Sequence, residues 1–575
     1  MDVLTWKIGG EAGFGILTTG LSFSKIAASF GYSIFDYIEY PSLIRGGHNN
    51  YEVVFSSKES GALKETIDYL VCLNKDTYEL HKHRLVKGSL VIFDPKDNSS
   101  VAYEQAVPIP FQEILDRSQG SPVMKNTIAL GASLALMCDD ISTLFGMIEK
   151  QFSNKGKEII EKNQYFAKQG FDYVKTHAPS KVKPIFTEKS EQEQYVLSGN
   201  DAFSLSSVIA DCRLYAAYPM TPSSSVLATL ASWEEKTGMV VRHSEDEIAV
   251  INTALGASFA GVRSAVGTSG GGFALMVESV SLAGITELPL VIFMAQRAGP
   301  ATGMPTWTEQ ADLLFTVFSG HGEFPKIVLA PGDQEEMLEL TGKAYNLADI
   351  YQTPVFVLSD MYLSESHASI PKKRLEAFIS TYRVNRGKTV EKPSGLPHLR
   401  YKDSPDGISE RLIPGYPGVF YQANSYEHSA DGHTSEKGED RVEQVQKRNR
   451  KTETYLANHF SAPKVYGDFD TADVVFVSWG SLKGVVNRAQ ILLAQSGKKS
   501  AHIHFTHVFP LDKEKVRKLF EAKKRYILVE QNSQAQFGQL LTMSTGVAIH
   551  EKILKFNGRP LLPEEITSYV EKINE

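Results

Sequence analysis

The sequence predicts an α/β protein whose chain forms several sheets with helices between their strands. Three observations support this fold class. Short apolar runs of strand length are bounded by Gly, Pro or Asp, as in LPLVIFMA at 288–295. Helical patterns separate these runs, and this alternation is typical of α/β proteins. The chain has 575 residues, more than one hydrophobic core usually supports, so about three domains are expected.

The first α/β domain is predicted over 1–178. Its strands are VLTWKIGG, YLVCLN and SLVIFDP, and ILTTGLSFSKIAASFGY is an amphipathic helix that ends at Gly31. Strands separated by helices predict a parallel sheet. Residues 179–200 are polar and charged, and we interpret them as a linker.

A second α/β domain is predicted over 201–369 and a third over 464–575. LPLVIFMA, FPKIVLAP and TPVFVLSD are the buried strands of the second, and ADVVFVSWG, SAHIHFTHVFPL and RYILVEQN those of the third. Residues 370–463 are rich in Pro, Gly, Asp and Ser, with a charged helical stretch near their end. A segment this long without periodicity is expected to be an extended linker that is functional or crosses a partner's surface.

Composition excludes several classes of protein. A net charge of -7 without a basic stripe argues against a nucleic-acid partner. The N-terminus lacks the pattern of a signal peptide, and no apolar run is long enough to cross a membrane, so a cytoplasmic location is expected. The three cysteines, Cys72, Cys138 and Cys212, are far apart and cannot supply four thiolates to an iron–sulfur cluster; the simplest interpretation is buried thiols.

Two glycine-rich stretches of the first domain are candidate ligand loops. GGEAGFG (9–15) joins a strand to a helix, where glycines let a ligand approach and the helix end attracts an anion. Its spacing is not GxGxxG, and close helix–sheet packing explains it equally well. YPSLIRGGHNNYEVVF (40–55) places Arg45 and His48 around a Gly pair, which suits an anion contact or an ordinary surface loop.

The second domain has four candidate stretches. YPMTPSSS (218–225) follows an apolar run and is either a capped strand-to-helix turn or a ligand loop. In VRHSEDEIAVINTALGASFAG, three acids precede a helix of small residues; acids favour a first helical turn, but one of them can instead face a ligand. VGTSGGGF (266–273) is another strand-to-helix glycine loop. Arg297 directly follows LPLVIFMA, where it suits a carboxylate ligand or a structural acid.

Together these stretches resemble the alpha subunit of 2-oxoacid:ferredoxin oxidoreductases with the gamma domain fused at its N-terminus. YPMTPSSS is similar to the family's Tyr-Pro-Ile-Thr-Pro-Ser-Ser, with Met220 for Ile, and TSGGGF to its Thr-Ser-Gly-Pro-Gly-Phe, with Gly271 for Pro. QRAGPATGMPT is similar to its Arg-Gly-Pro-Ser-Thr-Gly loop, and VEQNSQAQFGQLL to its C-terminal domain. GGEAGFG, RGG and NTIALGA (126–132) are similar to the gamma domain, so the resemblance covers nearly the whole chain.

The resemblance implies a gamma domain, a pyrimidine-type thiamine-diphosphate-binding domain and a transketolase C-terminal-like domain. It assigns Glu247 to the aminopyrimidine of the cofactor, where a carboxylic acid would favour the imino tautomer that generates the ylide. Thr221 would hydrogen-bond the substrate, Arg297 would bind its carboxylate, and Tyr218 and Pro219 would line the wall beside the cofactor. We expect Gly10, Gly13, Gly15 and Arg45 to contact coenzyme A, or Arg45 the substrate's distal carboxylate.

The resemblance also implies partners. Mg²⁺ and a [4Fe–4S] cluster would lie on a separate beta subunit, without which this chain is inactive, in an (alpha-beta)2 heterotetramer that reduces ferredoxin. The reaction is reversible in the family, so it could serve CO2 fixation in a reductive TCA cycle. The 2-oxoglutarate type is the most similar, with pyruvate or a branched-chain 2-oxoacid as alternative substrates. A non-catalytic scaffold subunit and, more weakly, an NAD(P)-dependent dehydrogenase are alternatives of other classes.

Overall fold

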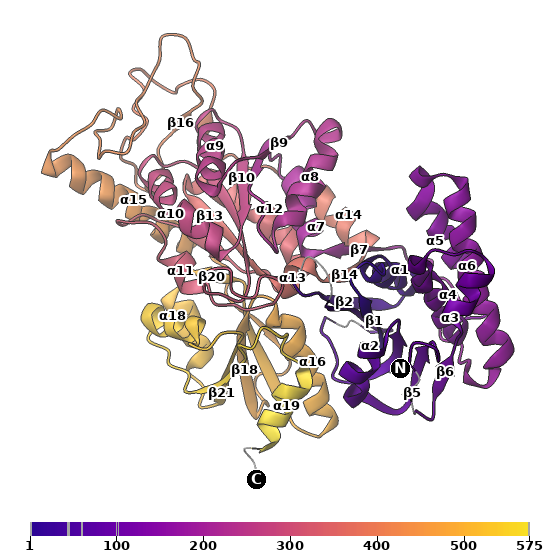
Figure 1. Cartoon of the computed structure of the whole chain (residues 1–575). Helices are drawn as coiled ribbons and strands as arrows, with labels where there is room; N and C mark the ends of the chain where they lie inside the picture. Colours follow the sequence, from indigo (N-terminus) through magenta and orange to yellow (C-terminus); the bar gives the residue numbers. More distant parts are fainter. Residues whose placement is uncertain (1–2, 43–46, 59–60, 99–100, 102, 573–575) are drawn as a thin grey trace. The chain divides into compact units, whose positions relative to one another are not determined.

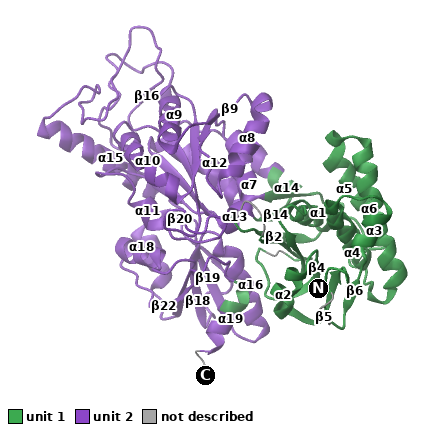
Figure 2. Ribbon diagram, viewed as in Figure 1, with its two compact units in different colours: residues 1–197, 366–375, 562–565 green, residues 198–365, 376–561, 566–575 purple. Residues whose placement is uncertain are grey.

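The computed structural model describes residues 3–42, 47–58, 61–98, 101 and 103–572. They form two compact units, drawn in different colours in Figure 2. Unit 1 comprises residues 1–197, 366–375 and 562–565, and unit 2 comprises residues 198–365, 376–561 and 566–575. In the described part of the chain, no helix is both long and apolar enough to cross a membrane.

Unit 1 is built on an eight-stranded sheet in the order β6-β5-β4-β1-β3-β2-β14-β7. The strands are β1 (Leu4–Glu11), β2 (Ser33–Glu39), β3 (His48–Ser56), β4 (Ile67–Cys72), β5 (Leu85–Phe93), β6 (Ala106–Pro108), β7 (Gln194–Ser198) and β14 (His367–Pro371). Strand β1 is parallel to β4 but antiparallel to β3. The sheet is therefore mixed, not parallel throughout, because β2 reaches β3 through a short connection that has no room for a crossover helix.

Glycines allow two helices of unit 1 to pack closely. The helices of this unit are α1 (Ile16–Ser29), α2 (Lys75–His81), α3 (Phe111–Arg117), α4 (Lys125–Met137), α5 (Ser142–Phe152) and α6 (Lys157–His177). A Cβ on Gly131 of α4 would lie 2.0 Å from the carbonyl oxygen of Ala167 on α6, and one on Gly170 of α6 equally close to that of Ile128. The two helix backbones are thus in direct contact, as only glycine permits.

Unit 2 contains a seven-stranded sheet in the order β20-β12-β13-β11-β10-β8-β9. Its strands are β8 (Leu214–Ala217), β9 (Val240–His243), β10 (Ser264–Thr268), β11 (Leu290–Gln296), β12 (Ile327–Leu329), β13 (Pro354–Asp360) and β20 (His507–Phe509). All neighbours are parallel except β20, which is antiparallel to β12. The predicted buried strands LPLVIFMA, FPKIVLAP and TPVFVLSD are β11, β12 and β13, and each lies in the core.

Helices cover both faces of this sheet (Figure 1). They are α7 (Gly199–Ile209), α8 (Ser224–Thr237), α9 (Glu247–Phe259), α10 (Gly270–Ile285), α11 (Leu313–Val317), α12 (Gln334–Tyr351) and α13 (Met361–Glu365). The chain passes from β8 outward to β9, then returns past β8 to β10 and continues to β11. The direction of strand addition therefore reverses between β8 and β10, which makes this pair the topological switch point of the sheet.

A second, five-stranded sheet of unit 2 has the order β17-β19-β18-β21-β22. Its strands are β17 (Lys464–Tyr466), β18 (Val474–Trp479), β19 (Ser500–Phe505), β21 (Arg525–Glu530) and β22 (Glu551–Leu554). Helices α16 (Leu482–Gln495), α17 (Lys513–Arg517) and α18 (Gln536–Thr545) also belong to unit 2, whereas α19 (Pro563–Lys572) has its first residues in unit 1 and the rest in unit 2. Short 3₁₀ turns occur at Lys82–Arg84, Pro122–Met124, Ser153–Lys155, Pro179–Lys181 and Lys518–Phe520.

The segment expected to be an extended linker contains α14 (Lys372–Thr381), β15 (Thr389–Val390), β16 (Arg411–Leu412) and α15 (Gly438–Asn458). Buried charges attach it to the seven-stranded domain. Lys447 and Lys451 of α15 each lie 2.5 Å from a carboxylate oxygen of Glu287, and all three side chains are buried. Burial raises the pKa of Glu287, but the two ammonium groups outweigh that effect and bring it below its ordinary value. Burial also lowers the pKa of Lys451, to about 7.

We predict that Glu287→Gln destabilises the full chain by about 3–5 kcal/mol, because it leaves two buried ammonium groups without a counter-charge. The free energy of unfolding in a denaturant titration measures this effect. Asp403→Asn is the matched control, since Asp403 pairs with Arg450 of the same helix at the surface and should contribute about 0–1 kcal/mol. Equal losses for the two variants would contradict the prediction.

Candidate active site

Three of the predicted ligand loops leave the same edge of the seven-stranded sheet. Strands β8, β10 and β11 are adjacent and parallel, with Ala217 paired to Gly267 and Thr268 paired to Met294. The YPMTPSSS, TSGGGF and QRAGPATG stretches therefore begin side by side at the carboxyl ends of these strands. This is the edge at which open α/β sheets bind ligands, and β8 and β10 form its switch point.

The hydroxyls of YPMTPSSS do not cap the helix that follows. Ser223 occupies the N-cap position of α8 without a capping hydrogen bond, and its hydroxyl donates to the carbonyl of Met220 at 2.8 Å. Thr221 is half-buried, and its carbonyl oxygen accepts a hydrogen bond from Arg297 Nη1 at 2.9 Å. Tyr218 and Pro219 are exposed beside it. The YPMTPSSS loop therefore helps to orient Arg297, which lies in the neighbouring loop after β11.

The three consecutive acids at the start of α9 have different environments. Glu245 is exposed, and Asp246 caps α9 by accepting a hydrogen bond from the backbone N–H of Ala249 at 2.8 Å. Glu247 begins the helix and is only 4% exposed. Among the described residues, no hydrogen-bond donor or cation pairs with its carboxylate. The capping role thus belongs to Asp246, which leaves Glu247 available to a ligand.

Two glycines at the start of α10 are each in contact with a carboxylate. A Cβ on Gly272 would lie 2.5 Å from Glu247 Oε1 and 2.4 Å from the hydroxyl of Thr268. A Cβ on Gly270 would lie 2.5 Å from Asp312 Oδ2. Between them, a Cβ on Gly271 would meet nothing closer than a carbonyl oxygen at 3.8 Å. Any larger residue at 270 or 272 would displace one of the two acids.

Arg297 follows β11 and is largely buried. Its Nε has no hydrogen-bond partner in the described part of the chain, and burial lowers its pKa. Burial raises the pKa of Asp312 to about 6, while the charge of Arg297 opposes this shift. Burial and the charge of Asp312 together raise the pKa of Glu309 to about 7. A largely buried cation thus lies near Asp312, and burial raises the pKa of both Asp312 and Glu309 toward neutrality.

Sequence reasoning missed Glu309 and Asp312. Both follow the loop after Arg297, and Gln310 between them is anchored to the five-stranded domain. Its backbone N–H donates to the carbonyl of Gln531 at 2.7 Å, and its carbonyl accepts from Asn532 Nδ2 at 3.1 Å. The sequence signal was two acids directly after a Gly/Pro loop at a strand's carboxyl end.

The predicted residues of the first domain lie in unit 1. Gly10 is in β1, where a Cβ would approach Leu73 and Phe14 at 3.1 Å. Gly15 precedes α1 at φ 69°, and a Cβ there would lie 2.2 Å from Asn126 Nδ2. Gly13, at φ 94°, has open space at its Cβ position. Close packing therefore accounts for Gly10 and Gly15, and Arg45 lies outside the described residues.

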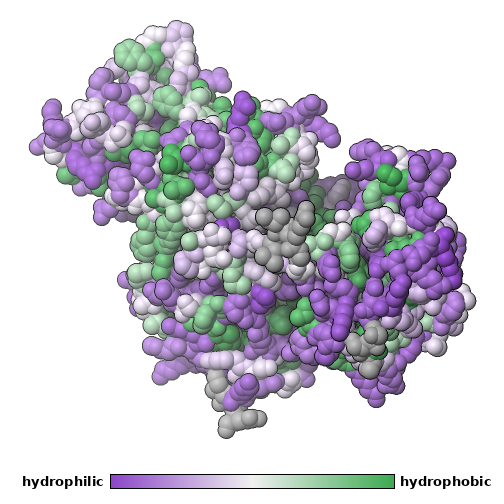
Figure 3. All heavy atoms as spheres, in the orientation of Figure 1, coloured by the Kyte–Doolittle hydropathy of each residue, from purple (hydrophilic) through white to green (hydrophobic). Residues whose placement is uncertain are grey.

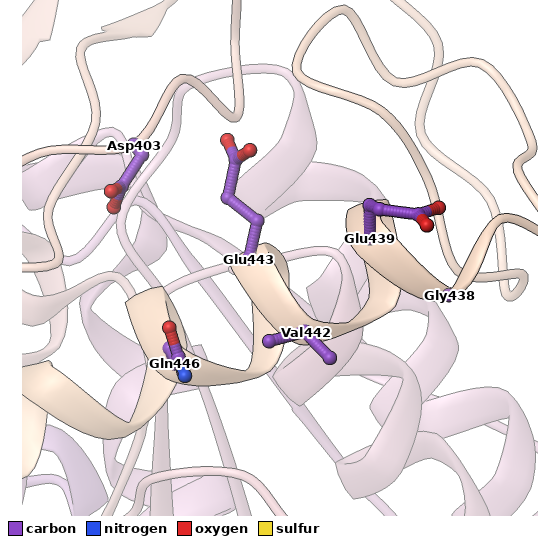
Figure 4. A pocket seen from close by; sticks show the side chains of 6 residues that line it. All are labelled: Asp403, Gly438, Glu439, Val442, Glu443 and Gln446. Atoms are coloured by element: carbon purple, nitrogen blue, oxygen red, sulfur yellow. The ribbon is translucent and has the colours of Figure 1, made fainter.

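A shallow cavity of about 550 Å³ lies at the start of α15, and none of the predicted site residues lines it. Figure 4 shows its lining: Asp403, Gly438, Glu439, Val442, Glu443 and Gln446. Three of these side chains are acidic, and most of the lining comes from one helix. This cavity is distinct from the sheet edge that carries Glu247 and Arg297.

Apolar side chains are exposed on the helices next to the sheet edge. We call Ile248, Leu275, Phe315 and Phe318 the apolar face; each is more than a third exposed. Ile248 follows Glu247, and the other three belong to α10 and α11 or their ends. Figure 3 shows hydrophobic surface in the region of α10 and α11.

The polar groups fit a cofactor with a nitrogen-containing ring. Glu247 is a buried acid without a protein partner, and the hydroxyl of Ser269 is fully buried and unpaired within the described residues. Unpaired buried polar groups are costly unless a ligand satisfies them. A carboxyl group in this position can form a hydrogen bond with a ring nitrogen of a ligand, which is the contact expected with the aminopyrimidine of thiamine diphosphate.

Comparison with known proteins finds related families over two parts of the chain. The family described as "Pyruvate flavodoxin/ferredoxin oxidoreductase, thiamine diP-bdg" matches residues 206–447, and "Pyruvate ferredoxin/flavodoxin oxidoreductase" matches residues 5–173. The 2-oxoglutarate:ferredoxin oxidoreductase of Magnetococcus marinus, solved with 2-oxoglutarate, coenzyme A and succinyl-CoA bound, has a TM-score of 0.91 and 29% identity, with 100% of both chains covered. This likeness and the observed sheets confirm the predicted α/β fold class.

Curated relatives match over the same length. The 2-oxoglutarate oxidoreductase subunit KorA of Mycobacterium tuberculosis is 27% identical, covering 98% of this chain and 90% of the relative. The 2-oxoacid:ferredoxin oxidoreductase subunit alpha of a Sulfolobus species is 32% identical, covering 99% of this chain and 97% of the relative. The chain therefore belongs to the alpha subunits of the 2-oxoacid:ferredoxin oxidoreductases, and it has a thiamine-diphosphate-binding domain.

Proposed function

We propose that this chain is the alpha subunit of a 2-oxoglutarate:ferredoxin oxidoreductase that uses thiamine diphosphate and forms succinyl-CoA. The observation that carries the proposal is the buried carboxylate of Glu247, which has no partner among the described residues and lies against Gly272 at the sheet edge shared with Arg297. The joint presence of Glu247, Thr221 and Arg297 favours an active subunit over a non-catalytic scaffold.

Glu247 would hold the aminopyrimidine ring. In its protonated form, its Oε1 can donate a hydrogen bond to a ring nitrogen, and the exclusion of other partners strengthens that bond. Tyr218 and Pro219 would line the wall next to the ring. When bound, thiamine diphosphate supplies the nucleophilic carbon that attacks the carbonyl of the 2-oxoacid.

Arg297 would bind the substrate's carboxylate. Its guanidinium is fixed at one end by the Thr221 carbonyl, and its Nε remains unpaired within the described structure. A planar guanidinium offers paired donors that match a carboxylate. The hydroxyl of Thr221 would donate to the carbonyl or carboxylate of the same substrate. The choice of 2-oxoglutarate rests on the Magnetococcus marinus and Mycobacterium tuberculosis relatives, and pyruvate or a branched-chain 2-oxoacid is the alternative.

Coenzyme A would contact unit 1. Gly10, Gly13 and Gly15 surround the start of α1, where the helix end favours a phosphate group, and Gly13 leaves open space for a close approach. Arg45 would contact coenzyme A or the substrate's distal carboxylate.

The remaining parts would come from a beta subunit that carries Mg²⁺ and a [4Fe–4S] cluster. This chain has three cysteines, and each is buried, so it does not supply four cluster ligands. The apolar face would dock that subunit, giving an (alpha-beta)2 assembly that passes electrons to ferredoxin. With reduced ferredoxin as donor, the reverse reaction would fix CO2, as in a reductive TCA cycle. The assembly would be cytoplasmic.

Replacing Glu247 tests the carboxylate directly. We expect Glu247→Gln to lower turnover of the complex by about 10²- to 10⁴-fold, because the amide cannot supply the proton. Steady-state reduction of a viologen dye with 2-oxoglutarate and coenzyme A measures this. The matched control Glu245→Gln changes an exposed acid two residues away and should keep full activity. Full turnover of the Glu247 variant would refute the assignment.

Replacing Gly272 tests the geometry without removing the acid. Gly272→Ala places a methyl group within 2.5 Å of Glu247 Oε1, and a displacement of about 1 Å costs roughly 10²-fold in turnover. Gly256→Ala on α9 is the control, because its Cβ position is open. Near-normal activity of Gly272→Ala, with its fold verified by circular dichroism, would show that the carboxylate needs no fixed position.

Purification and substrate comparison test the partner and the substrate. We expect a smaller chain with a brown chromophore to co-purify, and the isolated chain to be inactive. Assays of the complex should give a higher kcat/KM for 2-oxoglutarate than for pyruvate or a branched-chain 2-oxoacid. A higher kcat/KM for pyruvate or a branched-chain 2-oxoacid would change the proposed substrate and leave the proposed enzyme class unchanged.

A further inference from the structure

Asp312 does not perform the structural role that its position suggests. It occupies the N-cap position of α11, where an Asp side chain normally accepts a backbone hydrogen bond, but it makes no capping bond there. Its carboxylate instead lies against Gly270, with Cβ-to-oxygen distances of 2.5 and 2.9 Å for a Cβ built on that glycine. Among the described residues, neither a hydrogen-bond donor nor a cation within ion-pair distance pairs with this carboxylate.

The carboxylate reaches the N-terminus of another helix. Ser269, the N-cap residue of the 16-residue helix α10, makes no side-chain capping bond, although its hydroxyl is fully buried and unpaired within the described structure. The positive end of the α10 dipole stabilises a negative charge at this point. The Asp312 carboxylate therefore lies at an otherwise uncapped helix end.

The backbone of Asp312 is fixed relative to Arg297. Its N–H donates to Gln296 Oε1 at 3.0 Å, and Gln296 immediately precedes Arg297. On the other side, Gln536 accepts from the Leu314 N–H at 3.0 Å and donates to the Ala311 carbonyl at 2.6 Å. These bonds hold the carboxylate at a set position in the field of the arginine.

Two charged groups of the described residues interact with Asp312. Arg297, at the end of β11, attracts its carboxylate, and the charge of Asp312 in turn raises the pKa of Glu309 on the same loop. Arg297 is bonded through Nη1 to the Thr221 carbonyl, a neutral acceptor, while its Nε stays unpaired in the described structure. Within the part of the chain that the structure describes, Asp312 is thus the anion that acts on Arg297 when no substrate is present.

We propose that Asp312 is a positioning residue that competes electrostatically with the 2-oxoacid carboxylate for Arg297, so that protonation of Asp312 tightens substrate binding. This inference rests on the proposed function of Arg297. Ionised Asp312 reduces the positive charge that Arg297 presents to the substrate, and protonation of Asp312 restores that charge. Because burial raises the pKa of Asp312 to about 6, the KM for the 2-oxoacid should rise as the pH increases from 5 to 7.5.

Asp312→Asn tests the proposal in the assembled complex. At pH 7.5 we expect its KM for the 2-oxoacid to fall about 3- to 5-fold below the wild-type value, since one charge interaction is removed. Its KM should lose most of the wild-type pH dependence, with kcat within about 2-fold. The matched control Asp512→Asn alters an Asp that caps α17 by its side chain, and it should keep the wild-type KM profile.

Two further variants separate the alternatives. Gly270→Ala moves the carboxylate without removing it and should also change the pH dependence of KM. Glu309→Gln should retain that dependence, because it leaves both Asp312 and Arg297 in place. A purely structural Asp312 would lower the melting temperature and kcat of Asp312→Asn and leave the pH profile of KM unchanged, which would overturn the proposal.

The outcomes also separate this inference from the proposed function. A wild-type complex that turns over no 2-oxoacid refutes the function and, with it, the role of Asp312. An active complex in which Asp312→Asn keeps the wild-type KM at every pH refutes only the inference. A melting temperature of full-length Asp312→Asn equal to that of the wild type verifies that the two KM values are compared on folded protein.

Discussion

The geometry of the site depends on the contact between the Glu247 carboxylate and the backbone of α10 at Gly272. The absence of a side chain at Gly272 gives Glu247 its place, and the Asp246 cap fixes the start of α9 so that Glu247 turns inward. Gly270 does the same for Asp312 on the other side. One helix end therefore sets the positions of two acids from two separate segments of the chain.

This arrangement explains why acids of similar sequence context have different properties. Glu245 and Asp246 are exposed to solvent, whereas Glu247, Glu309 and Asp312 are at least partly withdrawn from it. Withdrawal from water raises the pKa of Glu309 and Asp312 toward neutrality. Glu309 and Asp312 can therefore gain and lose protons near physiological pH.

Much of the fold could be predicted from the sequence, because β11, β12 and β13 are apolar runs that only a buried strand explains. The family was identified through motifs at strand ends, and the same motifs predict Glu247, Thr221 and Arg297 as site residues. Other features depend on contacts distant in sequence. The mixed sheet of unit 1 follows from a short connection between β2 and β3. The Asp312 carboxylate lies against Gly270, which is 42 residues earlier in the chain. In the sequence, Lys447 and Lys451 resemble residues on the solvent-exposed face of a helix. The structure shows that both form buried ion pairs with Glu287.

The attachment of α15 has a consequence for the order of folding. Glu287 and Lys447 are 160 residues apart in the chain, so their pairing closes a long loop whose entropic cost comes before any gain from the contact. On a ribosome, the seven-stranded sheet up to β13 would emerge and collapse before α15 is synthesised. Until then Glu287 would remain hydrated, and the later arrival of the two lysines would exclude water from its carboxylate.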